Sequence, residues 1–250
     1  DRSGHLHPLN YTLGLAAAAE AAGVQIHEQA MVVGIEHGST VRVRTIAGPS
    51  VRARHVALCC NAFIDEMISK ALRDRIMPVG TYIIATERLG QVRIESLLRE
   101  NVAVSDVNFV LDYFRRSDDH RLLFGGRVSY SGRDALNTAN ATRARMLKVF
   151  PSLADAKTDF AWGGHVDITM SRAPDFGRIA PNVYYLQGFS GHGIALTGIA
   201  GQMVAETIAG QAERFDLFTK LRHRDFPGGP ALRTPALMLA MLWFRLKDLL

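Results

Sequence analysis

The sequence predicts a mixed α/β fold in which an α/β domain is interrupted by an antiparallel sheet domain. Strand and helix patterns alternate at both ends of the 250-residue chain, whereas the middle holds strands joined by short polar turns. Hydrophobic residues make up 48% of the chain, a composition typical of a globular protein with a sizeable core. We therefore expect four parts, at residues 1–75, 76–173, 174–216 and 217–250.

The first part opens with an expected helix over residues 7–22, because Pro8 suits a first helical turn and the alanines favour helix. Gly23 is the expected left-handed cap of this helix. Three strands follow, the first two as a meander, within residues 24–38, 39–48 and 49–60. Residues 55–60, HVALCC, form a continuous apolar run, as expected of a strand buried in a parallel sheet.

Beyond residue 61 the pattern predicts five further elements: a helix or irregular helical segment, a strand, a hairpin, an amphipathic helix and a strand. They cover, in this order, residues 62–75, 76–89, 108–130, 135–153 and 157–170. The hairpin turns at residues 117–120, the amphipathic helix stops before Pro151, and a glycine break falls at residues 163–164. A last strand over 181–187 leads through a glycine-rich turn into a helix that Gly210 caps.

Charge and cysteine content exclude several classes of protein. The net charge is +5, but the basic residues are dispersed, without the stripe and interleaved aromatic residues typical of nucleic-acid binding. Such a surface attracts acidic small molecules or simply keeps the protein dissolved. Cys59 and Cys60 are adjacent, so neither a disulfide nor a metal site is expected. We expect both to be buried at a strand end, in a protein of the reducing cytoplasm.

The two ends of the chain carry weaker signals. Residues 1–9 lack the basic and apolar regions of a signal peptide, and we expect the chain to begin partway through a longer product. Residues 236–244 are an unbroken apolar run, too short for a bilayer, which needs roughly 20 residues. This run predicts a helix docked on the core, an interfacial membrane helix flanked by Arg233, Arg245 and Lys247, or a partner-binding helix.

The stretch QGFSGHGIALTGIAGQMVAETIAG, residues 187–210, places a glycine turn before an apolar helix. Glycines let a ligand approach the backbone, and the unpaired N–H groups of a helix start carry partial positive charge. Open α/β sheets bind ligands at such strand ends. The spacing is not G-x-G-x-x-G, because Leu196 stands at the third glycine position, and it is not a P-loop. By spacing alone, the turn is either a ligand site or a structural corner.

Several motifs together resemble the FAD-dependent oxidoreductases related to D-amino-acid oxidase, in the order that this family shows. The glycine turn is similar to the family's C-terminal flavin motif, and residues 3–36 resemble the segment that closes the flavin domain. Residues 55–63 and 162–193 look closest to the gamma-glutamylputrescine oxidase branch. The family's opening strand–G-x-G-x-x-G–helix occurs nowhere in this sequence. We therefore expect an incomplete FAD-binding Rossmann-like domain with an inserted antiparallel substrate domain.

The resemblance implies FAD-dependent oxidation of a small-molecule amine, with a gamma-glutamylated diamine as the favoured substrate. A hydride equivalent leaves the carbon that bears the nitrogen, and the imine hydrolyses to an aldehyde and ammonia. Dioxygen or a membrane quinone accepts the electrons, with hydrogen peroxide formed in the first case. No catalytic base is implied when the amine arrives neutral. The alternatives are an amino-acid or sarcosine-type oxidase or dehydrogenase, and a non-catalytic binding subunit.

The resemblance also implies roles for residues by their position in the motifs. The implied flavin-binding residues are Val33, Asn61, Ala62, Gly188, Phe189, Ser190, Gly191, His192, Gly193, Ile194 and Ala195. The amides of residues 191–194 would face the pyrimidine edge of the flavin, where the helix start stabilises negative charge. Arg115 is the implied substrate-carboxylate arginine or a solvated hairpin arginine, with Arg116 as a rival. Tyr82 and Trp162 are candidate pocket walls or core residues. Glycine oxidase places a second arginine where Gly191 stands, which disfavours alpha-amino acids as substrates.

Overall fold

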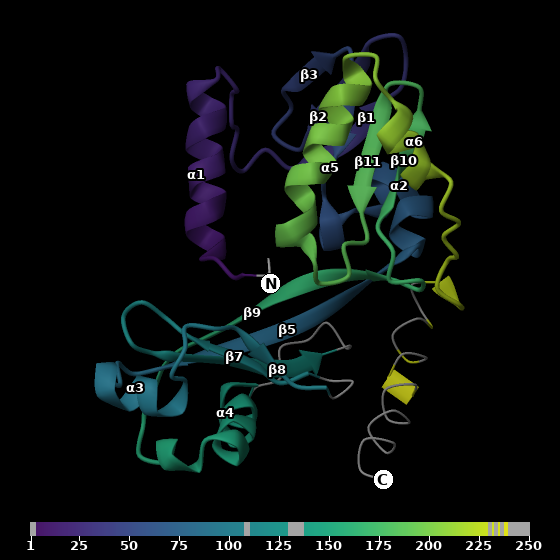
Figure 1. The fold of residues 1–250 in the computed structure, drawn as a ribbon. Helices are drawn as coiled ribbons and strands as arrows, with labels where there is room; N and C mark the ends of the chain where they lie inside the picture. The colour runs from purple at the N-terminus through teal and green to yellow at the C-terminus, as the bar shows by residue number, and fades with distance from the viewer. Residues whose placement is uncertain are drawn as a thin grey trace. The chain divides into compact units, whose positions relative to one another are not determined.

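The computed structural model describes residues 4–107, 111–129 (backbone only at 127–129) and 138–229, together with residues 232, 235, 238 and 239. The chain divides into two compact units (Figure 1). The split unit consists of Leu6–Met77 and Val166–Gly229, and the inserted unit of Asp1–His5, Pro78–His165 and Pro230–Leu250. Strands β5 (Ile76–Thr86) and β9 (Thr158–Thr169) pass from one unit into the other.

Two three-stranded sheets form the framework of the split unit. The first pairs antiparallel in the order β1, β2, β3, with bounds at Val32–Glu36, Val41–Thr45 and Ser50–Ala53. The second has the order β10, β11, β4, with bounds at Asp175–Ala180, Val183–Gln187 and Val56–Leu58. Because β11 is parallel to β4, the carboxyl ends of these two strands meet at one edge of the sheet.

Alternation of side chains in β11 explains the layers around the second sheet. The helical elements of this unit are α1, η1, α2, α5 and α6, with bounds at Pro8–Ala21, Asn61–Phe63, Glu66–Asp74, Gly193–Ile208 and Glu213–Thr219. Tyr184 and Leu186 pack on one face with residues of α5 and α6. Val183 and Tyr185 pack on the other face with residues of α2 and β2. The predicted helix before Gly23 and the last strand, turn and helix are therefore confirmed.

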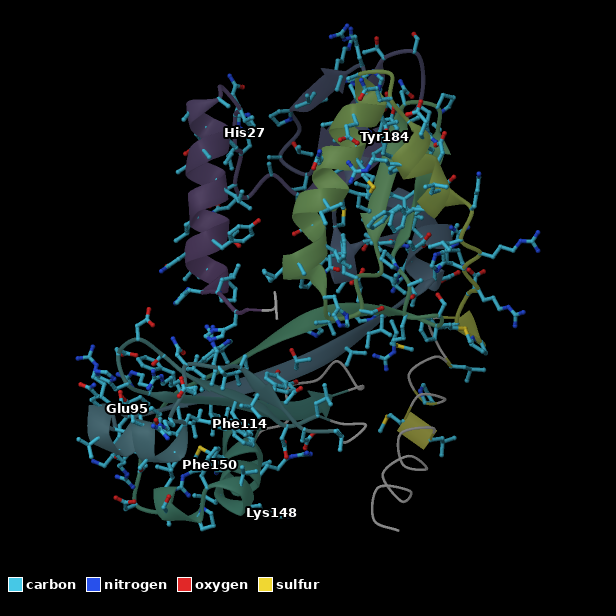
Figure 2. The ribbon with its side chains drawn as sticks, viewed as in Figure 1. His27, Glu95, Phe114, Lys148, Phe150 and Tyr184 are labelled. Atoms are coloured by element: carbon cyan, nitrogen blue, oxygen red, sulfur yellow. The ribbon has the colours of Figure 1, made fainter. Side chains whose placement is uncertain are left out.

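A five-stranded sheet with helices on one face forms the inserted unit. Its strand order is β6, β7, β8, β5, β9, with β6 at Val104–Ser105, β7 at Tyr113–Arg116 and β8 at Leu122–Ser129. The covering elements α3, α4 and η2 have bounds at Gln91–Leu97, Thr138–Val149 and Pro151–Leu153. They bury Ile84 and Phe124 of the sheet. Phe114 of β7 meets Phe150 edge-on, with ring centroids 4.9 Å apart (Figure 2).

The structure corrects the strand expected over residues 49–60. This stretch forms two strands in different sheets, β3 and β4, because the chain changes direction at residues 54–55. Cys59 and Cys60 are exposed rather than buried. The physical reason is that β4 is the terminal strand of its sheet in the part of the chain that the structure describes, so its end lacks a covering neighbour. Residues 24–31 also lie outside any strand, and the expected strand there begins only at Val32.

The expected break at residues 163–164 is also wrong, because β9 continues through both glycines. A Cβ at Gly163 would lie 2.8 Å from the ring of Tyr82, so glycine is needed there for close packing. The elements β10 and α3 were not predicted. Both are short, and β10 owes its place to pairing with β11 rather than to its own pattern.

The expected C-terminal helix lies mostly outside the described residues, and so do the membrane and partner contacts expected of it. Where the structure does describe the chain, none of its helices combines the length and apolar character needed to cross a bilayer.

Candidate functional site

The glycine turn joins β11 to α5 at the edge where β4 and β11 end. Gly188, Ser190 and Gly191 have positive φ angles of 76°, 52° and 91°. A Cβ at Gly188 would lie 2.5 Å from the methyl group of Thr169, whereas a Cβ at Gly191 would meet none of the described atoms within 4 Å. Glycine is therefore required at 188 for both space and conformation, and at 191 for conformation alone.

A buried carboxylate holds the first half of this turn. Asp167, near the end of β9, is only 1% exposed. Its two oxygens accept hydrogen bonds from the backbone N–H of Gly188 and from that of Phe189, the latter at 3.1 Å. The backbone oxygen of Asp167 also accepts from the N–H of Ser190 at 2.9 Å. Three consecutive amides, those of residues 188–190, are thus occupied by a single residue that the sequence analysis did not identify.

Asn61, one of the implied flavin residues, joins the same carboxylate. With its amide oriented so that nitrogen faces Asp167, Nδ2 lies 2.9 and 2.5 Å from the two carboxylate oxygens. Asn61 has a positive φ of 50°, a conformation that asparagine tolerates better than most residues. It begins η1 just after β4, and the next residue, Ala62, is buried. Asp167 therefore links the chain segments that follow β4 and β11.

The surroundings of Asp167 shift the pKa of its carboxyl group in two opposite directions. Burial raises the pKa of the Asp167 carboxyl, and the nearby Asp175 carboxylate raises it further. The N–H groups of Gly188 and Phe189 lower this pKa, because they stabilise the charged form, but burial prevails. Asp175 is itself buried and accepts hydrogen bonds from the Tyr185 hydroxyl at 3.1 Å and from Gln187 Nε2 at 2.9 Å. Burial, with Asp175 as a smaller cause, raises the pKa of Tyr185 to about 12.

The second half of the turn has donors that the protein does not use. Among the described residues, none accepts a hydrogen bond from the backbone N–H of Gly191, Gly193 or Ile194; we call these three the open amides. His192 departs from the expectation that all amides of residues 191–194 face a ligand, because its N–H donates to the oxygen of Phe189 at 2.9 Å. The His192 side chain is exposed and makes no capping bond.

The open amides fit one end of a flavin. They lie at the start of the 16-residue helix α5, where unpaired N–H groups and the helix dipole favour an electron-rich partner. The pyrimidine edge of an isoalloxazine ring carries carbonyl oxygens and a ring nitrogen, which accept such hydrogen bonds. Ile194 and Ala195 beside them are exposed. Val33 lies half-buried on β1, within the split unit but on the other sheet.

The implied substrate residues all lie in the inserted unit. Arg115 on β7 places Nη1 2.7 Å from Nδ1 of His5, whose Nε2 lies 3.0 Å from the backbone oxygen of Asn101. Its rival Arg116 forms an ion pair with Glu95 at 3.5 Å. Strand alternation places these two arginines on opposite faces of the sheet.

The two aromatic candidates differ in exposure. Tyr82 is buried against Gly163, whereas Trp162 is 46% exposed. Tyr113, which the sequence analysis did not single out, shares the face of Arg115 on β7 and packs over Gly125, where a Cβ would lie 2.3 Å from its ring. The Tyr113 hydroxyl forms a hydrogen bond with the Thr81 side chain, and burial raises the pKa of Tyr113. The described part of the chain contains no group of three or more His, Cys, Asp or Glu side chains that could hold a metal ion.

Comparison with known proteins shows which protein family this chain matches. A family model described as FAD dependent oxidoreductase (DAO) matches residues 1–207. The chain is 42% identical to gamma-glutamylputrescine oxidoreductase of Escherichia coli (strain K12) over 245 residues, which cover 98% of this chain and 57% of that protein.

Solved structures show the same fold. Glycine oxidase from Geobacillus kaustophilus superposes with a TM-score of 0.69 at 20% identity, over 85% of this chain and 57% of that one. L-proline dehydrogenase from P. horikoshii gives a TM-score of 0.68 at 22% identity, over 83% and 57%. These similarities confirm the expected mixed α/β class. The chain spans 57% of the length of each of these three proteins.

Proposed function

The chain belongs to the DAO family of FAD-dependent oxidoreductases, and from this premise we propose that it forms the part of an amine oxidase that receives the ring system of FAD. The observation that carries the proposal is the set of open amides at Gly191, Gly193 and Ile194, at the carboxyl edge of a parallel strand pair. The chain spans 57% of the length of gamma-glutamylputrescine oxidoreductase of Escherichia coli. The activity of the whole protein is therefore itself proposed.

FAD, when bound, supplies the two-electron oxidant for the carbon that bears the amine. The open amides donate hydrogen bonds to the electron-rich edge of its ring. The positive end of α5 stabilises negative charge at that edge without reorganisation, because glycine and the fixed backbone already hold the donors in place. The proposed flavin contacts are the eleven residues that the sequence analysis gives as implied flavin-binding residues. Among them, Gly191, Gly193 and Ile194 are the principal hydrogen-bond donors.

We propose a gamma-glutamylated diamine as the substrate, oxidised to an aldehyde with release of ammonia and hydrogen peroxide. The similarity to a relative named for gamma-glutamylputrescine supports this choice. Gly191 has no side chain that could grip an α-carboxylate next to the reacting carbon. Arg115, Tyr82 and Trp162 are the proposed substrate-binding residues, and Arg115 would hold a more distant carboxylate by a bidentate contact.

Substrate competition tests this function in the complete gene product purified with its flavin. Gamma-glutamylputrescine, glycine and sarcosine are supplied separately, and hydrogen peroxide and flavin bleaching are followed together. We expect the fastest bleaching and peroxide release with gamma-glutamylputrescine. Faster turnover of glycine or sarcosine would overturn the substrate proposal. Bleaching without peroxide would assign the electrons to an acceptor other than dioxygen, and a colourless protein that takes up no FAD would overturn the proposal as a whole.

A further inference from the structure

We infer that Asp167 is the positioning residue of this flavin site: its carboxylate holds Gly188, Phe189 and Asn61 so that the open amides stay directed toward a ligand. The inference rests on the proposed function in one respect only, which is that the ligand of the open amides is FAD. The positioning itself is a property of the chain and can be measured without any ligand.

Asp167 connects three elements at the ligand edge of the second sheet. It stands on β9, while its donors come from the turn after β11 and from Asn61 after β4. The turn needs positive φ angles at Gly188, Ser190 and Gly191; glycine adopts such angles readily, but Ser190 does so rarely in a free chain. Hydrogen bonds from residues 188–190 to one fixed residue select this conformation. Once it is selected, the N–H groups of residues 191, 193 and 194 are the donors left for a ligand.

Within the described residues, the Asp167 carboxylate is stabilised by N–H donors instead of a cation. N–H groups of the turn and of Asn61 surround the Asp167 carboxylate, and in the described part of the chain no Lys, Arg or His forms an ion pair with it. Burying a carboxylate without a cation costs free energy unless hydrogen bonds compensate, and here backbone and amide N–H groups provide those bonds. Asp112 in the inserted unit shows the usual arrangement, since it is buried at 9% exposure and bonds Arg145 Nε at 2.7 Å.

The chemistry of the donor set specifies aspartate. Each carboxylate oxygen accepts a backbone N–H, and both oxygens accept from Asn61. Asparagine has nearly the same shape, but its NH₂ group would face an N–H donor and leave that donor without a partner. Asp167→Asn therefore keeps the volume of the side chain but removes one of the two oxygens that accept backbone N–H groups. Asp112→Asn is the matched control, because it also neutralises a buried aspartate but lies in the other unit.

The test measures FAD affinity, the visible flavin spectrum and thermal stability in the complete gene product. For Asp167→Asn we expect about tenfold weaker FAD binding, as for one buried donor left unpaired, and a displaced flavin absorption band. For Asp112→Asn we expect a loss of thermal stability with wild-type FAD affinity and spectrum. A purely structural role predicts that the two variants behave alike, and unchanged FAD affinity and spectrum in Asp167→Asn would overturn the inference.

Two further measurements separate this inference from the proposed function. Amide hydrogen exchange without flavin is expected to be at least about tenfold faster at Gly188 and Phe189 in Asp167→Asn than in the wild type. Unchanged exchange there would overturn the positioning role even in a protein that binds no FAD. If Asp167→Asn does not fold, Asn61→Ala removes a donor from the same carboxylate, and we expect a several-fold loss of FAD affinity. Wild-type FAD affinity in Asn61→Ala would then contradict the inference.

Discussion

The two halves of the glycine turn, residues 188–190 and 191–194, both contain glycine but differ in whether their backbone N–H groups find an acceptor in the protein. In residues 188–190, every backbone N–H donates to Asp167, and a Cβ at Gly188 would collide with Thr169. In residues 191–194, the N–H groups of Gly191, Gly193 and Ile194 have no acceptor among the described residues, and the space at Gly191 is open. Glycine therefore serves close packing in the first half and ligand access in the second.

This difference shows why a glycine-rich motif alone does not locate a ligand. The first half precedes α5 and the second half runs into its first turn, and each half contains a glycine with a positive φ angle. An internal acceptor, the Asp167 carboxylate, already satisfies the backbone N–H groups of the first half, as a bound anion would. The donors that the protein leaves unpaired are the ones that can add new hydrogen bonds to a ligand.

The largest expected effect separates the two glycines. Gly188→Ala should lower the free energy of unfolding by about 3 kcal/mol, because it adds left-handed strain to a 2.5 Å overlap with Thr169. Gly191→Ala should lower it by about 1 kcal/mol, from strain alone. Urea unfolding of both variants checks this prediction. Equal losses would show that the two halves are packed alike.

An intermediate effect is expected at Ile194, where proline removes an open amide. Proline is tolerated in the first turn of a helix, so Ile194→Pro should keep the wild-type stability to within about 0.5 kcal/mol. It should weaken FAD binding by about 1 kcal/mol, the value of one hydrogen bond. Ile194→Ala is the control for the lost side chain and should bind FAD as the wild type does. If both variants bind FAD equally, as followed by flavin fluorescence, the amide of residue 194 is not a flavin donor.

The smallest expected effect is a pH dependence of the folding stability that Asp167 contributes to the first half of the turn. Burial raises the pKa of Asp167 above its unfolded value of 3.8. A group of this kind contributes its full stability below the unfolded pKa and loses it as pH rises through the folded pKa. The stability of the wild type relative to Asp167→Asn should therefore fall as pH rises from below 3.8 through that range. Urea unfolding at several pH values measures this, and an increase with pH would show that the N–H donors outweigh burial.

Much of the ligand edge could be predicted from the sequence. The apolar strand before Gly188, the glycines and the long apolar run after Gly193 each follow from local pattern, and the structure confirms the strand, turn and helix. Residues of the turn lie within a few positions of one another, so their spacing already contains the geometry. The family resemblance was confirmed for the same reason, since its motifs are short and ordered.

Asp167 could not be predicted, because its partners are remote in sequence. It lies 21 and 22 residues from Gly188 and Phe189, and it meets them only when β9 ends beside the turn. Within HVDIT an acidic residue at an alternating position suggests a solvent-facing side chain. The exposure of Cys59 and Cys60 was missed for a related reason, because a strand's place at the sheet edge is a property of the whole sheet.

The most direct test of the central claim is to follow backbone amide chemical shifts while FAD is added to the complete gene product. We predict that the signals of Gly191, Gly193 and Ile194 move furthest on binding, while those of Gly188 and Phe189 move less because their N–H groups already donate to Asp167. Movement at Gly188 and Phe189, with the signals of Gly191, Gly193 and Ile194 unchanged, would contradict this prediction.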